Sequence, residues 1–257
     1  MSLVSIVTVV KDDQAGLDQT YQSLVSQIEL ESGAWQWIVV DGSAQPLTVA
    51  GSLPDGTQVK HELQNPEGIY AAMNCGLDMA TGDYVYFLNA GDTLAEATTL
   101  KNAIADLGSH QPVWIFGPVL FFNEQGYRLT EREWDYATER LNLFARGLFP
   151  PHQGTIMRTS VLRDAGGFSR DLDLVADYEA VLKVSLVADP LRVSYPIANF
   201  RQGGASTVHW RQALREFHQA RVRVLGPQGR QKLREQVHTG VQAAKHLGSA
   251  IKSKITK

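Results

Sequence analysis

Two continuous apolar runs near the start of the chain constrain the fold most strongly. Residues 4–10 and 35–40 are rich in β-branched and aromatic side chains, and such runs are typical of strands buried on both faces of a parallel sheet. Between them, Leu17, Leu24 and Ile28 recur at helical spacing. The chain therefore begins with a β-α-β unit, whose crossover is expected to be right-handed.

The same alternation continues to about residue 107. A short strand is predicted near residues 58–63, a helix over 69–80 that stops at Thr81-Gly82-Asp83, and a buried strand over 84–88. Ligands of such sheets bind outside the carboxyl ends of the strands. Residues that directly follow these strands are therefore the first candidates for a functional site.

The second half predicts a mixed sheet with longer loops. Strands are expected over residues 113–122 and 154–157, a helix over 176–186, and a strand pair over 191–200 that is broken at Pro196. The fold class is thus α/β, with a mostly parallel central mixed sheet flanked by helices.

The last part of the chain has a helical and basic character. Two amphipathic helices are predicted on either side of Gly226-Pro227. Residues 211–257 contain eleven Lys or Arg and two Glu, whereas the first 210 residues are acidic. We therefore divide the chain into a domain at 1–210 and a basic helical extension at 211–257. The extension suits an anionic membrane surface or a lipid-linked diphosphate, and the alternative is a solvated helical face.

Composition excludes several classes of protein. At 257 residues with 44% hydrophobic side chains, the chain can bury one large core. A single cysteine, Cys75, allows no internal disulfide and fits a cytoplasmic protein, and no apolar stretch is long enough to span a bilayer. The sequence has no phosphate loop of P-loop NTPases, no dinucleotide-binding glycine motif and no nucleophile elbow.

Two predicted strands end in carboxylates. Asp41 follows the second apolar run, where it could bind a base or ribose; Asp41-Gly42 could equally be a turn. Asn89-Ala90-Gly91-Asp92 follows the strand at 84–88, and its carboxylate could bind a divalent cation together with substrate phosphates. In the alternative, Asp92 or Thr93 caps a helix that begins near Leu94.

Further polar candidates lie in the second half. Asp177 opens the helix at 176–186, where it could act as a base toward a hydroxyl or simply favour the helix dipole. His152 and Gln153 follow two prolines, and Ser206 and His209 lie in or beside a glycine-rich segment. We expect these four residues to contact acceptor or phosphate, although each also has an ordinary structural interpretation.

Taken in order, these motifs resemble the family-2 glycosyltransferases, which have the GT-A nucleotide-sugar-binding fold. The resemblance rests on eight stretches of sequence: 4–10, 39–43, 67–74, 80–84, 87–92, 152–153, 166–168 and 176–179. It covers most of the first 210 residues. The long run from 67 to 92 is similar to members that build bacterial polysaccharides.

The resemblance implies an inverting transfer with Asp177 as the catalytic base. It also implies that Asp92 binds Mn²⁺ or Mg²⁺ and that Asp41 holds uracil or guanine. The residues that it implies for donor binding are Thr8, Val10, Asp41, Gly68, Asn74, Asn89, Ala90 and Gly91. Gly91 stands where relatives usually carry a first acidic residue, which leaves Asp92 as the single carboxylate of this motif.

The predicted function is therefore transfer of a sugar from a UDP- or GDP-linked donor to an acceptor hydroxyl, in bacterial cell-surface polysaccharide assembly. The expected partners are that donor, a sugar or lipid-linked saccharide acceptor and an anionic membrane surface, with no nucleic acid. The expected location is cytoplasmic, peripheral at the inner membrane face. The alternatives are a catalytically silent nucleotide-sugar binding module and a sugar nucleotidyltransferase.

Overall fold

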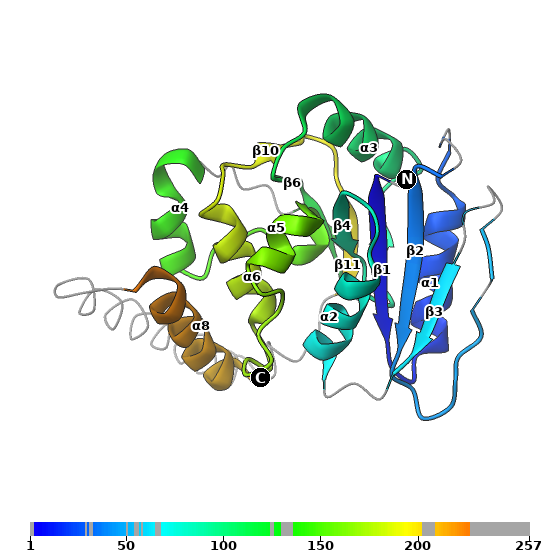
Figure 1. Cartoon of the computed structure of the whole chain (residues 1–257), viewed down its shortest axis with the longest axis horizontal. Coiled ribbons are helices and arrows are strands. Elements are labelled where there is room, and N and C mark those ends of the chain that lie inside the picture. Colours follow the sequence, from blue (N-terminus) through cyan, green and yellow to red (C-terminus); the bar gives the residue numbers. More distant parts are fainter. Residues whose placement is uncertain are drawn as a thin grey trace.

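The computed structural model describes residues 3–28, 30, 33–49, 51–53, 57, 59–64, 68–123, 126–129, 136–201 and 209–226. Its centre is a seven-stranded sheet in the order β10-β6-β9-β4-β1-β2-β3, drawn in Figure 1. The strands of this sheet are β1 (Val4–Val10), β2 (Trp35–Asp41), β3 (Val59–Leu63), β4 (Tyr84–Phe87), β6 (Trp114–Phe116), β9 (Thr155–Arg158) and β10 (Leu191–Arg192).

The sheet is mostly parallel, as the continuous apolar runs predict. Strand β1 pairs in parallel with both β2 and β4, and every residue of β1 and β2 is buried. Only β9 runs against its neighbours β4 and β6. The carboxyl ends of β1, β2 and β4 therefore meet at one edge of the sheet, where the candidate residues of the first half lie.

Helices cover both faces of the central sheet (Figure 1). One face packs against α2, α6 and α8, and the other against α1 and α3. The helices are α1 (Gln14–Val25), α2 (Ile69–Met79), α3 (Thr99–His110), α4 (Tyr136–Ala145), α5 (Thr159–Asp164), α6 (Ala176–Ser185), α8 (Trp210–Leu225) and the short 3₁₀ helix η1 (His152–Gly154). Helix α1 ends at Val25, so the prediction that Ile28 continues its helical stripe was wrong, and the Ile28 side chain is 47% exposed.

A second, four-stranded sheet has the order β5-β11-β7-β8. It contains β5 (Thr93–Leu94), β7 (Val119–Asn123), β8 (Gly126–Leu129) and β11 (Ala198–Arg201). The single strand predicted over 113–122 was therefore wrong, because β6 and β7 belong to different sheets. Gly117-Pro118 separates them, and proline has no N–H to continue a ladder of hydrogen bonds.

The prediction that a helix begins near Leu94 was also wrong. Thr93 and Leu94 form β5, which pairs with β11, and α3 begins only at Thr99. Asp92 is therefore not a helix cap. The turn after β4 leads into the second sheet and is free of a capping role.

Helix α8 confirms the first amphipathic helix predicted after residue 210. Its buried Ala213 and Ala220 join the same core as α6, and its C-cap is Gly226 in the left-handed region, with φ 52°. The second predicted tail helix lies outside the described residues, and the division at residue 210 stays a prediction.

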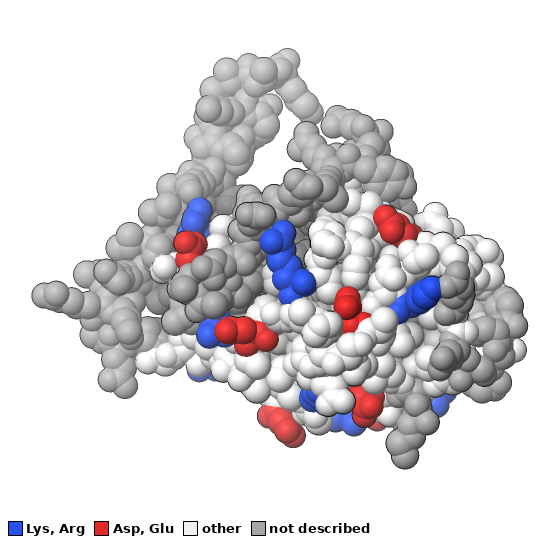
Figure 2. All heavy atoms as spheres, turned by 90° about the horizontal axis from the view of Figure 1, so that it is seen from above, with Lys and Arg blue, Asp and Glu red and all other residues white. Residues whose placement is uncertain are grey.

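Charged side chains of both signs are scattered over the face shown in Figure 2, and the described residues form no continuous patch of one sign there. No helix within the described ranges is long and apolar enough to cross a membrane.

Candidate active site

The turn after β4 is anchored tightly to α1. The amide of Gly91 donates to Gly16 O at 3.0 Å and to Thr20 Oγ1 at 3.1 Å, and Thr20 Oγ1 donates to Asp92 O at 2.8 Å. Gly91 has φ +89°, a left-handed conformation that favours glycine. This backbone conformation gives a physical reason for glycine at the position where the family usually carries an acidic residue.

Asp92 is only 5% exposed, and its contacts orient the carboxylate. Gln153 Nε2 donates to Asp92 Oδ2 at 3.3 Å. Gln153 O in turn accepts from Tyr86 Oη at 2.9 Å. Burial, with a contribution from the charge of Asp92, raises the pKa of Tyr86 well above its ordinary value, so this phenol stays a hydrogen-bond donor. The structure thus brings together Asp92 and Gln153, two of the predicted site residues.

Asp177 lies in the first turn of α6 and accepts hydrogen bonds on both carboxylate oxygens. Tyr70 Oη donates to Oδ1 at 3.0 Å, and His152 Nδ1 lies 3.1 Å from Oδ2. Burial and the nearby charge of Asp177 raise the pKa of Tyr70 well above its ordinary value, so the phenol remains protonated as a donor. The two contacts fix the carboxylate plane and leave further lone pairs for a proton acceptor role.

His152 connects Asp177 on α6 with Asn89 at the end of β4. Its Nε2 lies 3.2 Å from Asn89 Nδ2. Because the amide nitrogen is a donor, this arrangement assigns Nε2 as the acceptor and directs the Nδ1 proton to Asp177. The adjacent Gln153 reaches Asp92, so the two residues of one short helix touch the carboxylates of two distant elements.

Asn89 leaves one polar atom free for a ligand. Its Oδ1 is buried and has no hydrogen-bond partner within the described residues. A buried amide oxygen without a partner is costly. It is therefore a good acceptor, or a ligand for a hard cation, at the carboxyl end of β4.

Asp41 lies at the carboxyl end of β2 and is 1% exposed. Its carboxylate accepts from the amides of Ser43 at 2.9 Å and Leu47 at 2.8 Å, and His61 Nε2 lies 3.4 Å from Oδ2. Burial alone would raise the pKa of Asp41, but these hydrogen bonds outweigh it and hold the pKa below its ordinary value. Asp41 is thus an ionised residue that organises the loop after β2.

The remaining donor-side candidates differ in how available their side chains are. Thr8 is fully buried: its Oγ1 donates to Leu88 O at 2.8 Å and accepts from Trp37 Nε1 at 2.9 Å. Val10 ends β1, and the amide of Ala90 donates to Val9 O at 3.2 Å beside it. Thr8 is therefore engaged inside the sheet, and its donor-binding role stays a prediction.

Gly68 and Asn74 belong to α2. Gly68 is the N-cap residue, with φ 104°, and is exposed. Asn74 exchanges two hydrogen bonds with the backbone of Phe168 at 2.7 and 2.9 Å, so its side chain is occupied by the loop before α6. His209 is the exposed N-cap residue of α8, and the structure records no contact between it and the cluster around Asp177. Ser206 lies outside the described residues.

Sequence reasoning missed the contacts of Tyr70 and His61 with the carboxylates of Asp177 and Asp41. It also missed the hydrogen bond from Thr20 to the backbone carbonyl of Asp92. Tyr70 stands inside a motif quoted for the family resemblance, so its position carried a signal that we did not interpret. Thr20 and His61 have no such signal, because a threonine within a helix or a histidine in an edge strand is ordinary in sequence. Their roles depend on which elements the fold places side by side.

The described residues contain no group of three or more His, Cys, Asp or Glu side chains that could enclose a metal ion. The oxygen donors present at the end of β4 are the Asp92 carboxylate and the unpartnered Asn89 Oδ1. Mg²⁺ and Mn²⁺ sites often use one or two carboxylates and complete their coordination with water and substrate phosphates. The donor set therefore fits a cation that is shared with a bound diphosphate.

Comparison with known sequences gives a family match. The model of glycosyl transferase family 2 matches residues 5–166. An uncharacterized glycosyltransferase of Mycobacterium tuberculosis (strain H37Rv) is 27% identical over 210 residues, which are 79% of this chain and 77% of the relative. A PGL/p-HBAD biosynthesis glycosyltransferase of the same strain is 30% identical over 154 residues, 57% of each chain.

Solved structures confirm the GT-A fold. Staphylococcus aureus TarS 1-349 in complex with UDP-GlcNAc has a TM-score of 0.65 at 18% identity, with 87% of this chain and 67% of that chain covered. The mannosyltransferase PcManGT from Pyrobaculum calidifontis, in complex with GDP-Man and Mn²⁺, has a TM-score of 0.61 at 14% identity, with 97% and 75% covered. At these identities the likeness concerns the fold alone.

Proposed function

Since this chain belongs to glycosyl transferase family 2 and is a glycosyltransferase, we propose that it transfers a sugar from a UDP- or GDP-linked donor to an acceptor hydroxyl with inversion at the anomeric carbon. The observation that carries the proposal is the connection made by His152 and Gln153. These neighbours contact Asp177 and Asp92 respectively. One short helix thus holds a candidate base and a candidate diphosphate-side carboxylate in a fixed relation.

Asp177 is the proposed catalytic base. Its carboxylate takes the proton of the acceptor hydroxyl while that oxygen forms a bond to the anomeric carbon. The bond from the anomeric carbon to the diphosphate oxygen breaks, and the nucleoside diphosphate leaves with the electron pair from the opposite face of the sugar. Tyr70 and His152 hold the carboxylate toward the acceptor through the hydrogen bonds described above.

Asp92 and Asn89 are the proposed ligands for a divalent cation, Mn²⁺ or Mg²⁺, at the end of β4. When bound, such an ion offsets negative charge on the diphosphate leaving group as a Lewis acid. Gln153 keeps the Asp92 carboxylate oriented. The GT-A neighbour that binds Mn²⁺ supports divalent metal use.

The nucleotide is proposed to bind along the carboxyl ends of β1, β2 and β4. Asp41 would contact the base, with His61 beside it, and Ala90 and Gly91 would approach the donor through the backbone. Neighbours with the same fold bind UDP-GlcNAc or GDP-Man. This supports a nucleotide-sugar donor.

The proposed acceptor is a sugar or a lipid-linked saccharide of a bacterial surface polymer. A relative named for PGL/p-HBAD biosynthesis supports such a setting. We propose further that the basic residues after Gly226 contact an anionic membrane face, where they would bring the enzyme to a lipid-linked acceptor.

The donor and metal assignments are tested together by calorimetry with UDP, GDP and their sugars, with and without Mn²⁺. Asp92→Ala should abolish the Mn²⁺-dependent part of nucleotide binding. Asp83→Ala removes an exposed carboxylate at the opposite end of β4 and should leave binding unchanged. Binding by no nucleotide diphosphate would overturn the proposal, and unchanged binding without any sugar transfer would favour the silent binding module.

The membrane contact is tested in the full chain by changing Lys252, Lys254 and Lys257 to Glu. Cosedimentation with vesicles that contain anionic lipid should fall, because each basic residue near the surface contributes about 1 kcal/mol. Changing Lys11, Lys60 and Lys101 to Glu alters the net charge equally and is the control. Equal loss in both variants would reduce the effect to net charge and contradict a specific contact by the tail.

A further inference from the structure

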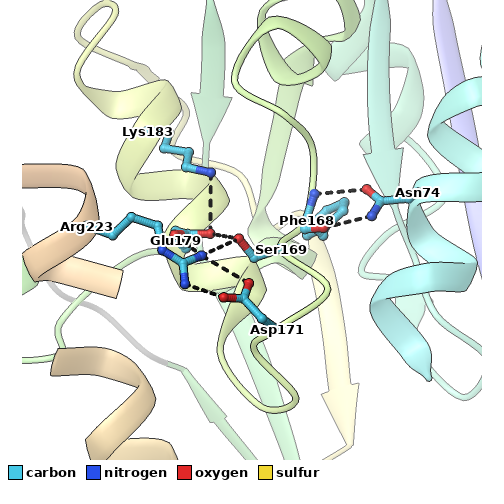
Figure 3. Close-up of polar contacts among 7 residues, drawn as sticks. All are labelled: Asn74, Phe168, Ser169, Asp171, Glu179, Lys183 and Arg223. Carbon is cyan, nitrogen blue, oxygen red and sulfur yellow. Dashed lines mark hydrogen bonds and ion pairs between the residues drawn. The ribbon is translucent and has the colours of Figure 1, made fainter. Parts of the chain in front are cut away.

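The segment that leads into Asp177, residues 168–175, is held from two sides by other elements. On one side lies α2, which also carries Tyr70, and on the other side lies α8. Figure 3 shows the contacts from Asn74 on α2 and from Arg223 on α8. The base is therefore carried by a segment whose position depends on long-range contacts.

On the α2 side, the side-chain amide of Asn74 meets the backbone of Phe168. Asn74 donates to Phe168 O at 2.7 Å and accepts from Phe168 N at 2.9 Å, so its amide acts like a strand partner. A Cβ added at Gly167 would lie 2.5 Å from Asn74 Oδ1, and Gly167 has φ +62°. The glycine therefore permits the segment to come this near to α2.

The α8 side depends on Arg223. Its guanidinium makes a two-atom contact with the Asp171 carboxylate, with Nη1 at 3.1 Å from Oδ1 and Nη2 paired with Oδ2. Nη1 also donates to Ser169 Oγ at 3.0 Å and to Glu179 Oε1 at 3.3 Å. The hydrogen bond with Asp171 raises the pKa of Arg223 and lowers that of Asp171, so both groups stay charged.

Arg223 matters for the site because one of its partners, Glu179, is a buried carboxylate close to Asp177. The carboxylate lies two residues after Asp177 in the first turn of α6, and its side chain is fully buried. Ser169 Oγ donates to Oε2, and Lys183 Nζ lies 3.3 Å from Oε2. A buried carboxylate requires compensating charge and hydrogen bonds. Arg223 and Lys183 supply that charge from α8 and from α6 itself.

Two further residues of α8 hold the same segment. Glu216 Oε2 accepts from the amide of Leu174 at 2.8 Å. Gln212 Nε2 donates to Asp173 Oδ2 at 3.1 Å and to Glu216 Oε1 at 2.8 Å. The contacts of α8 therefore run from Ser169 to Leu174, along nearly the whole approach to Asp177.

We propose that Arg223 is a positioning residue for Asp177. Through Arg223, helix α8 stabilises Glu179 and the 168–175 segment, and thereby fixes the start of α6 on which Asp177 lies. This inference rests on the proposed function for the role of Asp177. Arg223 touches no reacting atom. It holds the start of α6 at the place where the Asp177 carboxylate meets Tyr70 and His152.

The test compares Arg223→Met with Arg140→Met in the full chain. Arg140 is the matched control, because it contacts the other end of α6: its Nη1 lies 2.9 Å from Asp189 Oδ1 and donates to Ser185 O. Both substitutions remove an arginine bound to α6, but only the first should disturb the 168–175 segment. Apparent melting temperature is measured for both to account for loss of folded protein.

We expect Arg223→Met to lower kcat at least about tenfold, because small displacements of a catalytic group cost large factors in rate. KM for the donor should stay within about twofold. Arg140→Met should leave kcat within about twofold of the wild type. Arg223→Lys keeps the charge but not the two-atom contact with Asp171, so its kcat should be intermediate.

Hydrogen exchange gives a reading that does not need activity. Amides of residues 168–175 should exchange at least about tenfold faster in Arg223→Met than in the wild type. Their exchange rates in Arg140→Met should match those of the wild type. Unchanged exchange in Arg223→Met would overturn the inference, as would a kcat loss that both variants share in proportion to their melting temperatures. If the wild type transferred no sugar, the proposed function would fail, while the exchange result would still decide whether α8 holds the segment.

Discussion

The two principal carboxylates, Asp41 and Asp177, are held in opposite ways. Asp41 accepts from amides two and six residues further along its own loop, at Ser43 and Leu47. Asp177 accepts from Tyr70, 107 residues away, and from His152, 25 residues away. The loop around Asp41 is thus organised mainly by its own amides, whereas the surroundings of Asp177 are assembled from distant elements.

This difference follows from topology. Parallel β-α-β units bring the carboxyl ends of β1, β2 and β4 to one edge, and short turns there complete the donor side. The start of α6 has no such local frame. It is positioned by α2, η1 and α8, which are far apart in sequence. We therefore expect changes near Asp41 to affect mainly local stability and donor affinity, and changes near Asp177 to affect mainly the rate of transfer.

The largest effect is expected for Asp177→Asn. The substitution keeps the shape of the side chain but removes the proton acceptor, so transfer should fall by about 10³-fold, within the range for loss of general base catalysis. Donor affinity measured by calorimetry should remain within about twofold. Asp164→Asn, which changes an exposed carboxylate at the end of α5, should retain nearly full activity. Retention of transfer by the Asp177 variant would exclude this residue as the base.

A smaller effect is expected for Tyr70→Phe. Loss of one hydrogen bond to a carboxylate is worth about 1.5–3 kcal/mol, which corresponds to a reduction in kcat of about tenfold or more if it is fully expressed in the transition state. The control is Tyr84→Phe, which removes a phenol that donates to Pro112 O at 2.8 Å at the other end of β4. If both variants had the same kcat, the distinct role of the distant contact to Asp177 would be contradicted.

The smallest effect on the rate of transfer is expected for Asp41→Asn, which should lower the free energy of unfolding and weaken donor binding at the base. Because the folded pKa of Asp41 lies below its unfolded value of about 3.8, its contribution is present above that pH and is lost as pH falls through the folded pKa. The free energy of unfolding should drop by about 2 kcal/mol at pH 7. The difference from wild type should shrink below about pH 4.

Urea unfolding between pH 7 and pH 3 measures this difference. Asp18→Asn alters an exposed carboxylate of α1 and should show little change at any pH. A difference for Asp41→Asn that stays constant over the whole range would show that the stabilisation does not come from the ionised carboxylate.

Much of the fold was predictable from local pattern. The buried runs that form β1, β2 and β4, and the helical spacing of α2, α6 and α8, depend on residues close in sequence. The errors arose where tertiary pairing prevailed: Thr93 and Leu94 pair with β11 instead of starting a helix, and the apolar run after Val113 is shared between two sheets. In a run of apolar residues, only the partner strands decide where one strand ends and the next begins.

The sequence by itself determined the β-α-β order, the carboxylates at the ends of β2 and β4 and the family to which the chain belongs, because short-range patterns and motifs carry that information. Only the tertiary structure decided that Tyr70 and His152 meet Asp177, that Gln153 meets Asp92, and that Arg223 of α8 compensates the buried charge of Glu179. These contacts join residues that share no sequence periodicity. Their geometry arises when helices from distant parts of the chain pack on one face of the sheet.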